Sequence, residues 1–441
     1  MIQTMLARRS PFAFVRALKG RTEQTILANA SSVVGTMGVT SLLGYAYWWI
    51  AARLFDPAAV GLATALISAI TLLGMLSALG LGTLLVGEVA RRPSAARPLI
   101  LAAVLVTSAA AGLVALLFVA LAPLAIGDFA VLRVDPIFAG MFVAGAVGTT
   151  AALLLDQSVV GLLRGELQFV RNTVFSVVKL VLLVPCGTLL VSFGAASVFG
   201  SWVVGIPLSF LVFLPFLMPP RTSLRAVGGE VDRIRRLAAQ ATGHHVLNLA
   251  LLAPALVLPL IVTSVLSAEM NAYFYIAWIF ANLVFAIPGS LATTLYAVAA
   301  KAPDELGGRL RFSLVLSAVV GVAGTLGILV VGPLLLGWFG AGYREIAGVV
   351  LTLLVFGVFP LILKDHYIAV RRVEQNLGRA ALVIAAGTVV ELSGALIGVL
   401  LGGLPGLAIG WVLGVVIEAA VMTPTLVRTM RRPITPIGET S

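Results

Sequence analysis

The chain of 441 residues is 60% hydrophobic and only 11% charged, with 29 lysines and arginines against 18 acidic residues. A soluble globular domain is nearer half apolar and a quarter charged, so a water-soluble core is excluded and lipid is the expected solvent. The net charge of +11 does not indicate nucleic acid, because the basic residues cluster in short segments between long apolar runs. Cys186 is the only cysteine and lies inside such a run, which excludes a disulfide framework and a thiolate metal site.

The first segment, residues 1–29, is basic. Its lysines and arginines are Arg8, Arg9, Arg16, Lys19 and Arg21. Hydrophobic residues between Phe12 and Leu18 predict a short helix lying at the membrane surface. A cleaved signal peptide is not expected, because the small-residue triplet at 28–30 precedes the apolar run instead of following it.

Two long apolar stretches follow, residues 30–218 and 246–426, and each divides into six segments near the length that crosses ~30 Å of hydrocarbon. The segments of the first stretch are 30–52, 60–86, 98–123, 137–160, 171–192 and 195–218. Those of the second are 245–266, 272–299, 312–337, 346–363, 379–401 and 404–426. The runs lack apolar/polar alternation and are about twice the length of a barrel strand. The sequence therefore predicts an all-α polytopic membrane protein with about 12 transmembrane helices.

The only long polar stretch, residues 219–245, separates these two halves. Its five arginines stand against Glu230 and Asp232; they are Arg221, Arg225, Arg233, Arg235 and Arg236. A basic linker between two equal hydrophobic halves is typical of a duplicated membrane transporter. We expect this linker, the N-terminal segment and the tail at 427–441 to lie in the cytoplasm.

The positions of lysine and arginine support this topology. With the N-terminus inside, 25 of the 29 basic residues fall on the inner side, including Arg171 and Lys364, which the segment boundaries assign to inner loops. Such an asymmetry predicts cytoplasmic termini and a protein of the cytoplasmic membrane. The outer loops are short, so the functional groups are expected among the helices.

Four ionisable residues lie inside the apolar segments, and each is a candidate functional group because a charge within the bilayer is costly. They are Asp156, Lys179, Glu391 and Glu418. Glu418 continues a row of glycines four residues apart, and Glu391 shares a helix face with Gly387, Gly394 and Gly398. Rows of small residues mark close helix contacts, so these charges are predicted to point into the bundle. Lys179 either forms a structural ion pair with a carboxylate or contacts an anionic substrate, and the acids are candidates for protonation coupled to transport.

Prolines inside the segments are candidates for kinks. The seventh segment carries two of them, Pro254 and Pro259, which we interpret as hinge candidates between two open states. The sequence contains no GxxxxGK, HExxH, CxxC or GxSxG signature and only three histidines. We therefore expect no enzyme, no cofactor and no resident metal.

The first two segments resemble the opening of bacterial polysaccharide flippases. The matching positions are Ala52, Arg53, Leu54, Phe55, Pro57 and Gly61, then Ser77, Leu79, Gly80 and Leu81. In the second half, Phe339, Gly340, Tyr343 and Ala347 are similar to the pattern between helices nine and ten of that family. The family belongs to the multidrug/oligosaccharidyl-lipid/polysaccharide exporter (MOP) superfamily. The resemblance implies two six-helix bundles around a central cavity.

The resemblance also implies an ion-coupled flippase that moves a polyprenyl-diphosphate-linked oligosaccharide, with polysaccharide-assembly proteins as partners. Lys179, Arg53 and Arg164 are then the candidates for binding the substrate. A proton- or sodium-coupled multidrug or metabolite antiporter of the same superfamily is the alternative, and it would depend on Glu391, Glu418 and Asp156. A third possibility is a scaffold subunit of an envelope-synthesis complex.

Overall fold

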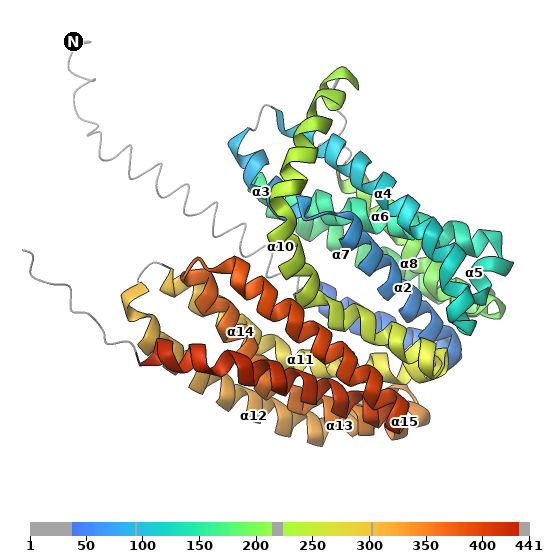
Figure 1. The fold of residues 1–441 in the computed structure, drawn as a ribbon. Coiled ribbons are helices and arrows are strands. Elements are labelled where there is room, and N and C mark those ends of the chain that lie inside the picture. Colours follow the sequence, from blue (N-terminus) through green and yellow to red (C-terminus); the bar gives the residue numbers. More distant parts are fainter. Residues whose placement is uncertain (1–37, 93–94, 214–223, 301–302, 432–441) are drawn as a thin grey trace, which may run out of the picture.

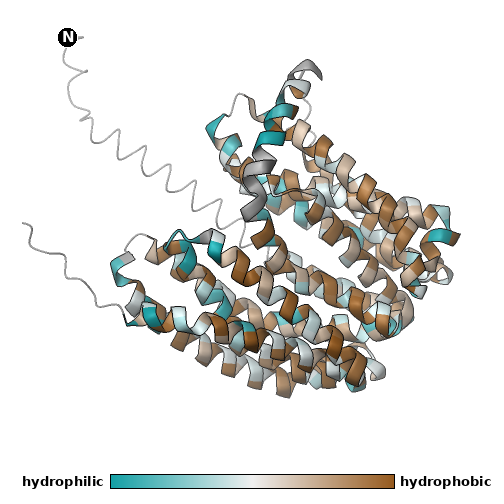
Figure 2. Cartoon of the chain, viewed as in Figure 1, coloured by the Kyte–Doolittle hydropathy of each residue, from teal (hydrophilic) through white to brown (hydrophobic). Residues whose placement is uncertain are grey.

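The computed structural model describes residues 38–92, 95–213, 224–300 and 303–431, and within these ranges the chain forms two helical bundles that lie side by side (Figure 1). The first bundle contains a helix over residues 38–54, α2 (Pro57–Ser77), α3 (Leu81–Arg91), α4 (Ala96–Ala125), α5 (Val131–Val134), α6 (Pro136–Gly161), α7 (Gly165–Leu189) and α8 (Ala195–Ser209). The second contains α10 (Leu224–Val265), α11 (Ala268–Ala299), α12 (Leu306–Phe339), α13 (Gly348–Leu354), α14 (Val358–Val373) and α15 (Leu377–Met430). Hydrophobic residues dominate the helices, and hydrophilic ones gather near their ends (Figure 2).

Ten helices in the described ranges are long and apolar enough to cross a membrane. The last of them, Gly378–Met430, makes two passes because its backbone leaves the helical conformation at Gly402 and Gly403. The helix over residues 38–54 supplies one further pass, which brings the number to twelve. The predicted all-α membrane fold is confirmed.

Three predicted segments have different limits in the structure. The second segment is interrupted between α2 and α3, where Leu79 and Gly80 adopt left-handed φ angles of 51° and 71°. The fifth begins at Gly165, so Arg171 lies within α7 and not in a loop. The tenth runs as one helical segment over Tyr343–Val373, with a single π-helical turn at its start, so Lys364 also lies inside a helix.

The two ends of the molecule differ in how the bundles meet. We call one the hairpin end; Pro57, Asp135, Ser267 and Gly402–Gly403 lie there. The other is the linker end, with Arg91, Arg164, the start of α10 and Met430. One apolar cluster joins both bundles, for example through Phe55 and Phe274, whereas separate clusters around Leu85 and around Leu310 lie toward the linker end. The bundles are therefore closed against each other at the hairpin end.

The described part of the predicted linker, from Leu224 onward, is helical and continues without a break into the seventh segment as α10. Arg233 of this part forms an ion pair with Glu88 of α3, beyond the end of the second predicted segment. The guanidinium of Arg233 holds the pKa of the Glu88 carboxyl below its ordinary value. The start of α10 is thus attached to the first bundle, while the rest of the helix also packs on α15.

The hinge candidates Pro254 and Pro259 both lie inside α10. Proline lacks an amide hydrogen, so Pro254 leaves the carbonyl of Ala250 without its helical donor. The hydroxyl of Thr388, from α15, lies 2.9 Å from that carbonyl and 2.9 Å from the carbonyl of Ile384 in its own helix, so it shares its one proton between the two acceptors. The kink is therefore compatible with a buried position, because a side chain of the neighbouring helix replaces the lost hydrogen bond.

The two arms of α15 pack against each other through glycines. A methyl group on Gly394 would lie 2.5 Å from the carbonyl oxygen of Gly410, and one on Gly398 would lie 2.0 Å from that of Gly406. The predicted rows of small residues therefore do mark a close helix contact, which is confirmed. Backbones this close leave no room for side chains, so larger side chains must face other helices or lipid.

Candidate functional site

A cavity of about 410 Å³ lies between the two bundles. Its walls come from the helix over 38–54, α2 and α8 on one side and from α10 and α11 on the other; the residues are Ser41, Gly44, Tyr45, Trp48, Ile67, Ser68, Thr71, Trp202, Ala255, Leu256, Tyr275, Trp278, Ile279 and Asn282. The two α10 residues lie between the hinge candidates Pro254 and Pro259. No charged side chain is among these lining residues. The lining combines aromatic rings with hydroxyl and amide groups.

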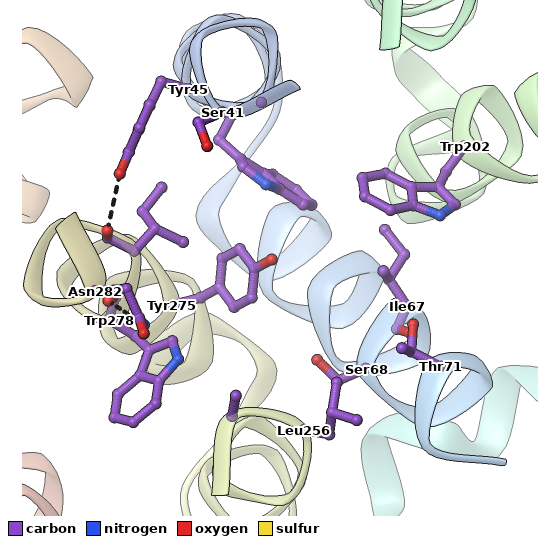
Figure 3. Close-up of a pocket in the computed structure, with 14 residues that line it drawn as sticks. Ser41, Tyr45, Ile67, Ser68, Thr71, Trp202, Leu256, Tyr275, Trp278 and Asn282 are labelled. Atoms are coloured by element: carbon purple, nitrogen blue, oxygen red, sulfur yellow. Dashed lines mark hydrogen bonds between the residues drawn. The ribbon is translucent and has the colours of Figure 1, made fainter. Parts of the chain in front are cut away.

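The rings form a continuous aromatic wall from one bundle to the other. Trp48 stacks on Trp202 with ring centroids 6.1 Å apart, and it meets Tyr275 edge-on at 5.1 Å. Figure 3 shows Trp202 on one side of the cavity and Tyr275 and Trp278 on the other. Large, flat apolar faces with a few polar groups between them are the usual composition of a pocket for an organic ligand.

Lys179 lies behind this wall and does not line the cavity. Its residue exposure is 4%, and its ammonium nitrogen is 3.6 Å from the ring centroid of Trp202 and 4.9 Å from those of Tyr47 and Phe175. No carboxylate of the described residues lies within ion-pair distance of this nitrogen. The ion pair considered from the sequence is therefore absent there, and three aromatic faces stabilise the charge instead.

The other two basic substrate-binding candidates lie at opposite ends of the molecule. Arg53, at the hairpin end, is exposed and donates to the backbone carbonyl of Trp338 from the other bundle at 2.7 Å. Arg164, at the linker end, forms a half-exposed ion pair with Glu166. The structure does not bring Lys179, Arg53 and Arg164 together, and a substrate contact of any of them stays a prediction.

The carboxylates of Glu391 and Glu418 meet in the second bundle, one from each arm of α15, and Lys364 of α14 lies between them. The ammonium nitrogen of Lys364 donates to Glu391 at 2.6 Å and to Glu418 at 2.9 Å. The side chains are only 5%, 1% and 1% exposed. We refer to these three residues as the acidic cluster. They form a buried site with two negative charges and one positive charge when all are ionised.

A tryptophan connects this cluster with the cavity. The indole N–H of Trp411 donates to the second carboxylate oxygen of Glu391 at 2.9 Å. The same indole meets Trp278, which lines the cavity, edge-on with centroids 5.0 Å apart. The cavity and the acidic cluster are therefore joined by two direct side-chain contacts.

Asp156, the third predicted coupling residue, is paired with Arg171 in the first bundle. Two guanidinium nitrogens of Arg171 donate to its two carboxylate oxygens at 2.8 and 2.6 Å, and Asn172 donates to one of them at 3.1 Å. Such a bidentate, buried pair is charge-balanced and well satisfied in hydrogen bonds. This geometry is typical of a structural ion pair between α6 and α7. A coupling role of Asp156 stays a prediction.

Replacing Asp156 by asparagine tests this structural role. We expect a loss of about 1.5–3 kcal/mol in the free energy of unfolding, because the asparagine amide is uncharged and offers Arg171 one acceptor oxygen instead of two. Thermal unfolding of the purified protein, followed by circular dichroism, measures the change. The control is E166Q, which alters a half-exposed pair and should cost less than about 1 kcal/mol. Equal effects of the two replacements would contradict the structural interpretation of Asp156.

Sequence reasoning missed both Lys364 and Arg171, which it placed in inner loops. Each lies near one end of an apolar run, where a basic residue is ordinarily solvated. Two signals point the other way. Four apolar residues, Tyr367 to Val370, follow Asp365 and His366 beyond Lys364, and carboxylates inside the membrane require a counter-charge.

No protein-family model and no curated protein matches the sequence. Solved structures do match over nearly the whole chain. An inward-facing structure of a multidrug resistance MATE family transporter of the MOP superfamily matches with a TM-score of 0.68, at 15% identity, over 90% of this chain and 98% of that one. The chain has the fold of the MOP superfamily.

Two further MOP-fold structures support this assignment. An outward-facing structure of a multidrug resistance MATE family transporter matches with a TM-score of 0.57, at 16% identity, over 92% of this chain and 96% of that one. A MOP superfamily transporter from Pyrococcus furiosus, described as having a binding pocket of reversed polarity, matches with a TM-score of 0.59, at 14% identity, over 93% and 96%.

Proposed function

We propose that the chain is a transporter of the cytoplasmic membrane that moves a polyprenyl-diphosphate-linked oligosaccharide from the inner to the outer leaflet, with both termini in the cytoplasm. The observation that supports this proposal is the uncharged aromatic cavity between the bundles. Sugar rings present apolar C–H faces that stack on aromatic rings, and their hydroxyl groups pair with side chains such as Ser68, Thr71 and Asn282. The polyprenyl chain stays in the bilayer.

In this proposal Lys179, which does not line the cavity, acts on the substrate through space. Its ammonium lies directly behind Trp202, one of the cavity walls. In a medium of low dielectric constant, a buried charge acts over several ångströms. A positive potential on this side of the cavity favours the anionic diphosphate and disfavours a cationic drug. An antiporter for cationic drugs would be favoured instead by carboxylates in the lining, and no lining residue is acidic.

Reconstitution into liposomes tests this function. A fluorescent polyprenyl-diphosphate oligosaccharide is placed in one leaflet, and its appearance in the other is measured with a membrane-impermeant quencher. We expect movement by the intact protein, and about a tenfold lower rate for W202A, which corresponds to ~1.4 kcal/mol of lost stabilisation. The control is W338A, which removes an exposed indole at the hairpin end. Transport of ethidium without movement of the glycan lipid would overturn the proposal in favour of a drug antiporter.

A further inference from the structure

The acidic cluster lacks one positive charge. Lys364 compensates one carboxylate, and no other basic group of the described residues lies within ion-pair distance of Glu391 or Glu418. An uncompensated charge that is 1% exposed carries a desolvation penalty of several kcal/mol. A cluster with this composition therefore favours the binding of one further positive charge.

The unpartnered atom of the cluster identifies the position of that charge. Both oxygens of Glu391 accept a hydrogen bond, one from Lys364 and one from Trp411. Glu418 accepts only at Oε2, and its Oε1 is buried with no hydrogen-bond partner. A buried acceptor without a donor is unfavourable. A proton on Glu418 removes the excess charge and makes this carboxyl a hydrogen-bond donor to the neighbouring carboxylate of Glu391.

The backbone around the cluster is shaped to hold these two carboxylates. Each glutamate lies four residues from a glycine on its own arm, and each packs against the glycine of the opposite arm. A methyl group on Gly387 would lie 2.2 Å from Cδ of Glu418, and one on Gly414 would lie 2.6 Å from Cα of Glu391. The arrangement is reciprocal across the turn at Gly402–Gly403, so the closeness of the two carboxylates follows from the fold.

We propose that the acidic cluster is a proton-binding site in which Oε1 of Glu418 takes up one proton from water and returns it to water. Binding changes the net charge of the cluster from −1 to 0, and no covalent bond other than the O–H bond forms or breaks. The ammonium of Lys364 already occupies the position between the carboxylates where a metal cation would bind. The site therefore selects a proton over sodium.

The charged groups that face Glu418 are Lys364 from α14 and Glu391 from the other arm of α15. The neighbours of Lys364 point elsewhere. The carboxylate of Asp365 lies beside Gly289 of α11, and His366 pairs with Ser313 of α12 at 2.8 Å. Protonation of Glu418 is therefore governed first by Lys364 and Glu391, and the next acidic group is Asp365, which interacts with Lys364 through its charge.

A change in the protonation of Glu418 is transmitted to the cavity wall through Trp411. When Glu418 is protonated, Glu391 is the one anionic group among the described residues within ion-pair distance of Lys364, and it is also the acceptor of the Trp411 indole. Trp411 contacts Trp278 of the cavity wall. Coupling of the proton to substrate movement rests on the transport function proposed above, whereas the proton site itself does not.

Infrared spectroscopy of the purified full chain in lipid nanodiscs tests the site, because a protonated carboxyl group has its own C=O stretching band. At neutral pH we expect this band in the intact protein, a shift of it in deuterium oxide, and its loss in E418Q. E391Q should also abolish it although Glu418 is present, because one carboxylate and one ammonium then balance. The control E166Q, at the surface, should leave the band unchanged. Circular dichroism checks that each variant is folded.

Absence of the band in the intact protein, or its persistence in E418Q, would overturn the proposal. Loss of the band when potassium is exchanged for sodium would also overturn it, because the site would then bind sodium. The two proposals fail separately. A band that behaves as expected without movement of the glycan lipid contradicts only the proposed function, and glycan movement without the band contradicts only the proton site.

Discussion

The K364M variant should unfold at a markedly lower temperature than the intact protein. The replacement leaves Glu391 and Glu418 facing each other without the ammonium that both accept from. Removing one partner of a buried ion pair typically costs about 3–5 kcal/mol, since the remaining charge keeps its desolvation penalty. Methionine is close to lysine in length and is apolar, so loss of packing contributes little. Thermal unfolding in detergent at about pH 8 measures the effect.

The pH dependence of the stability loss in K364M shows whether the loss comes from the missing positive charge or from changed packing. Protons that bind the two carboxylates of K364M replace the missing positive charge, so the stability deficit should become smaller as the pH falls. The triple variant K364M/E391Q/E418Q carries no ionised group in the cluster and should recover most of the lost stability at pH 8. The control is R92M, which removes an exposed basic residue and should change stability by less than about 0.5 kcal/mol. A deficit that does not depend on pH would contradict the electrostatic explanation.

Much of this architecture could be predicted from the sequence because it follows from solvation and from residue size. Apolar length fixes the number of passes, since a helix must bury its backbone groups within ~30 Å of hydrocarbon. The glycine rows around Glu391 and Glu418 predicted a close contact of two helices, and the arms of α15 make that contact. Apolar length and glycine spacing are both visible within a single segment of the sequence, so they can be predicted without knowing which segments meet.

The composition of the site could not be predicted in the same way, because it depends on contacts between distant segments. Lys364 lies 27 residues from Glu391 and 54 from Glu418, and nothing in the sequence pairs them. The sequence indicates that Lys179 is a charge within the membrane, but its partner is the set of aromatic rings formed by Tyr47, Phe175 and Trp202. The aromatic residues that surround a lysine follow no fixed separation in the sequence. The sequence therefore allows only two interpretations of Lys179, an ion pair with a carboxylate or a contact with an anionic substrate.

The G61A variant should shift the protein toward a state in which the bundles are separated at the hairpin end. In the structure α2 and α11 touch at this glycine, and a methyl group on it would lie 1.6 Å from the carbonyl oxygen of Ala268. Asn271 of α11 adds hydrogen bonds to the carbonyl of Gly61 at 2.8 Å and to the hydroxyl of Thr64 at 2.9 Å. Alanine is a better helix former than glycine by about 1 kcal/mol, so the helix itself is not weakened. The clash therefore acts on the contact between the bundles.

Spin labels at Val134 and Leu401 report this separation, because both side chains are more than 80% exposed and they belong to different bundles at the hairpin end. With Cys186 replaced by serine, the distance between the labels should be longer in G61A than in the parent. A shift from 1% to 99% of the separated state requires the closed state to lose about 5.5 kcal/mol relative to it. A contact of 1.6 Å is sufficient for this, because neither backbone can move aside without separating α2 from α11. Glycan movement should fall with it, because alternation requires both states. The control is G127A, at the same end, where a methyl group meets nothing within 4 Å. If G61A and G127A gave the same distances as the parent, the contact at Gly61 would not hold the two bundles together.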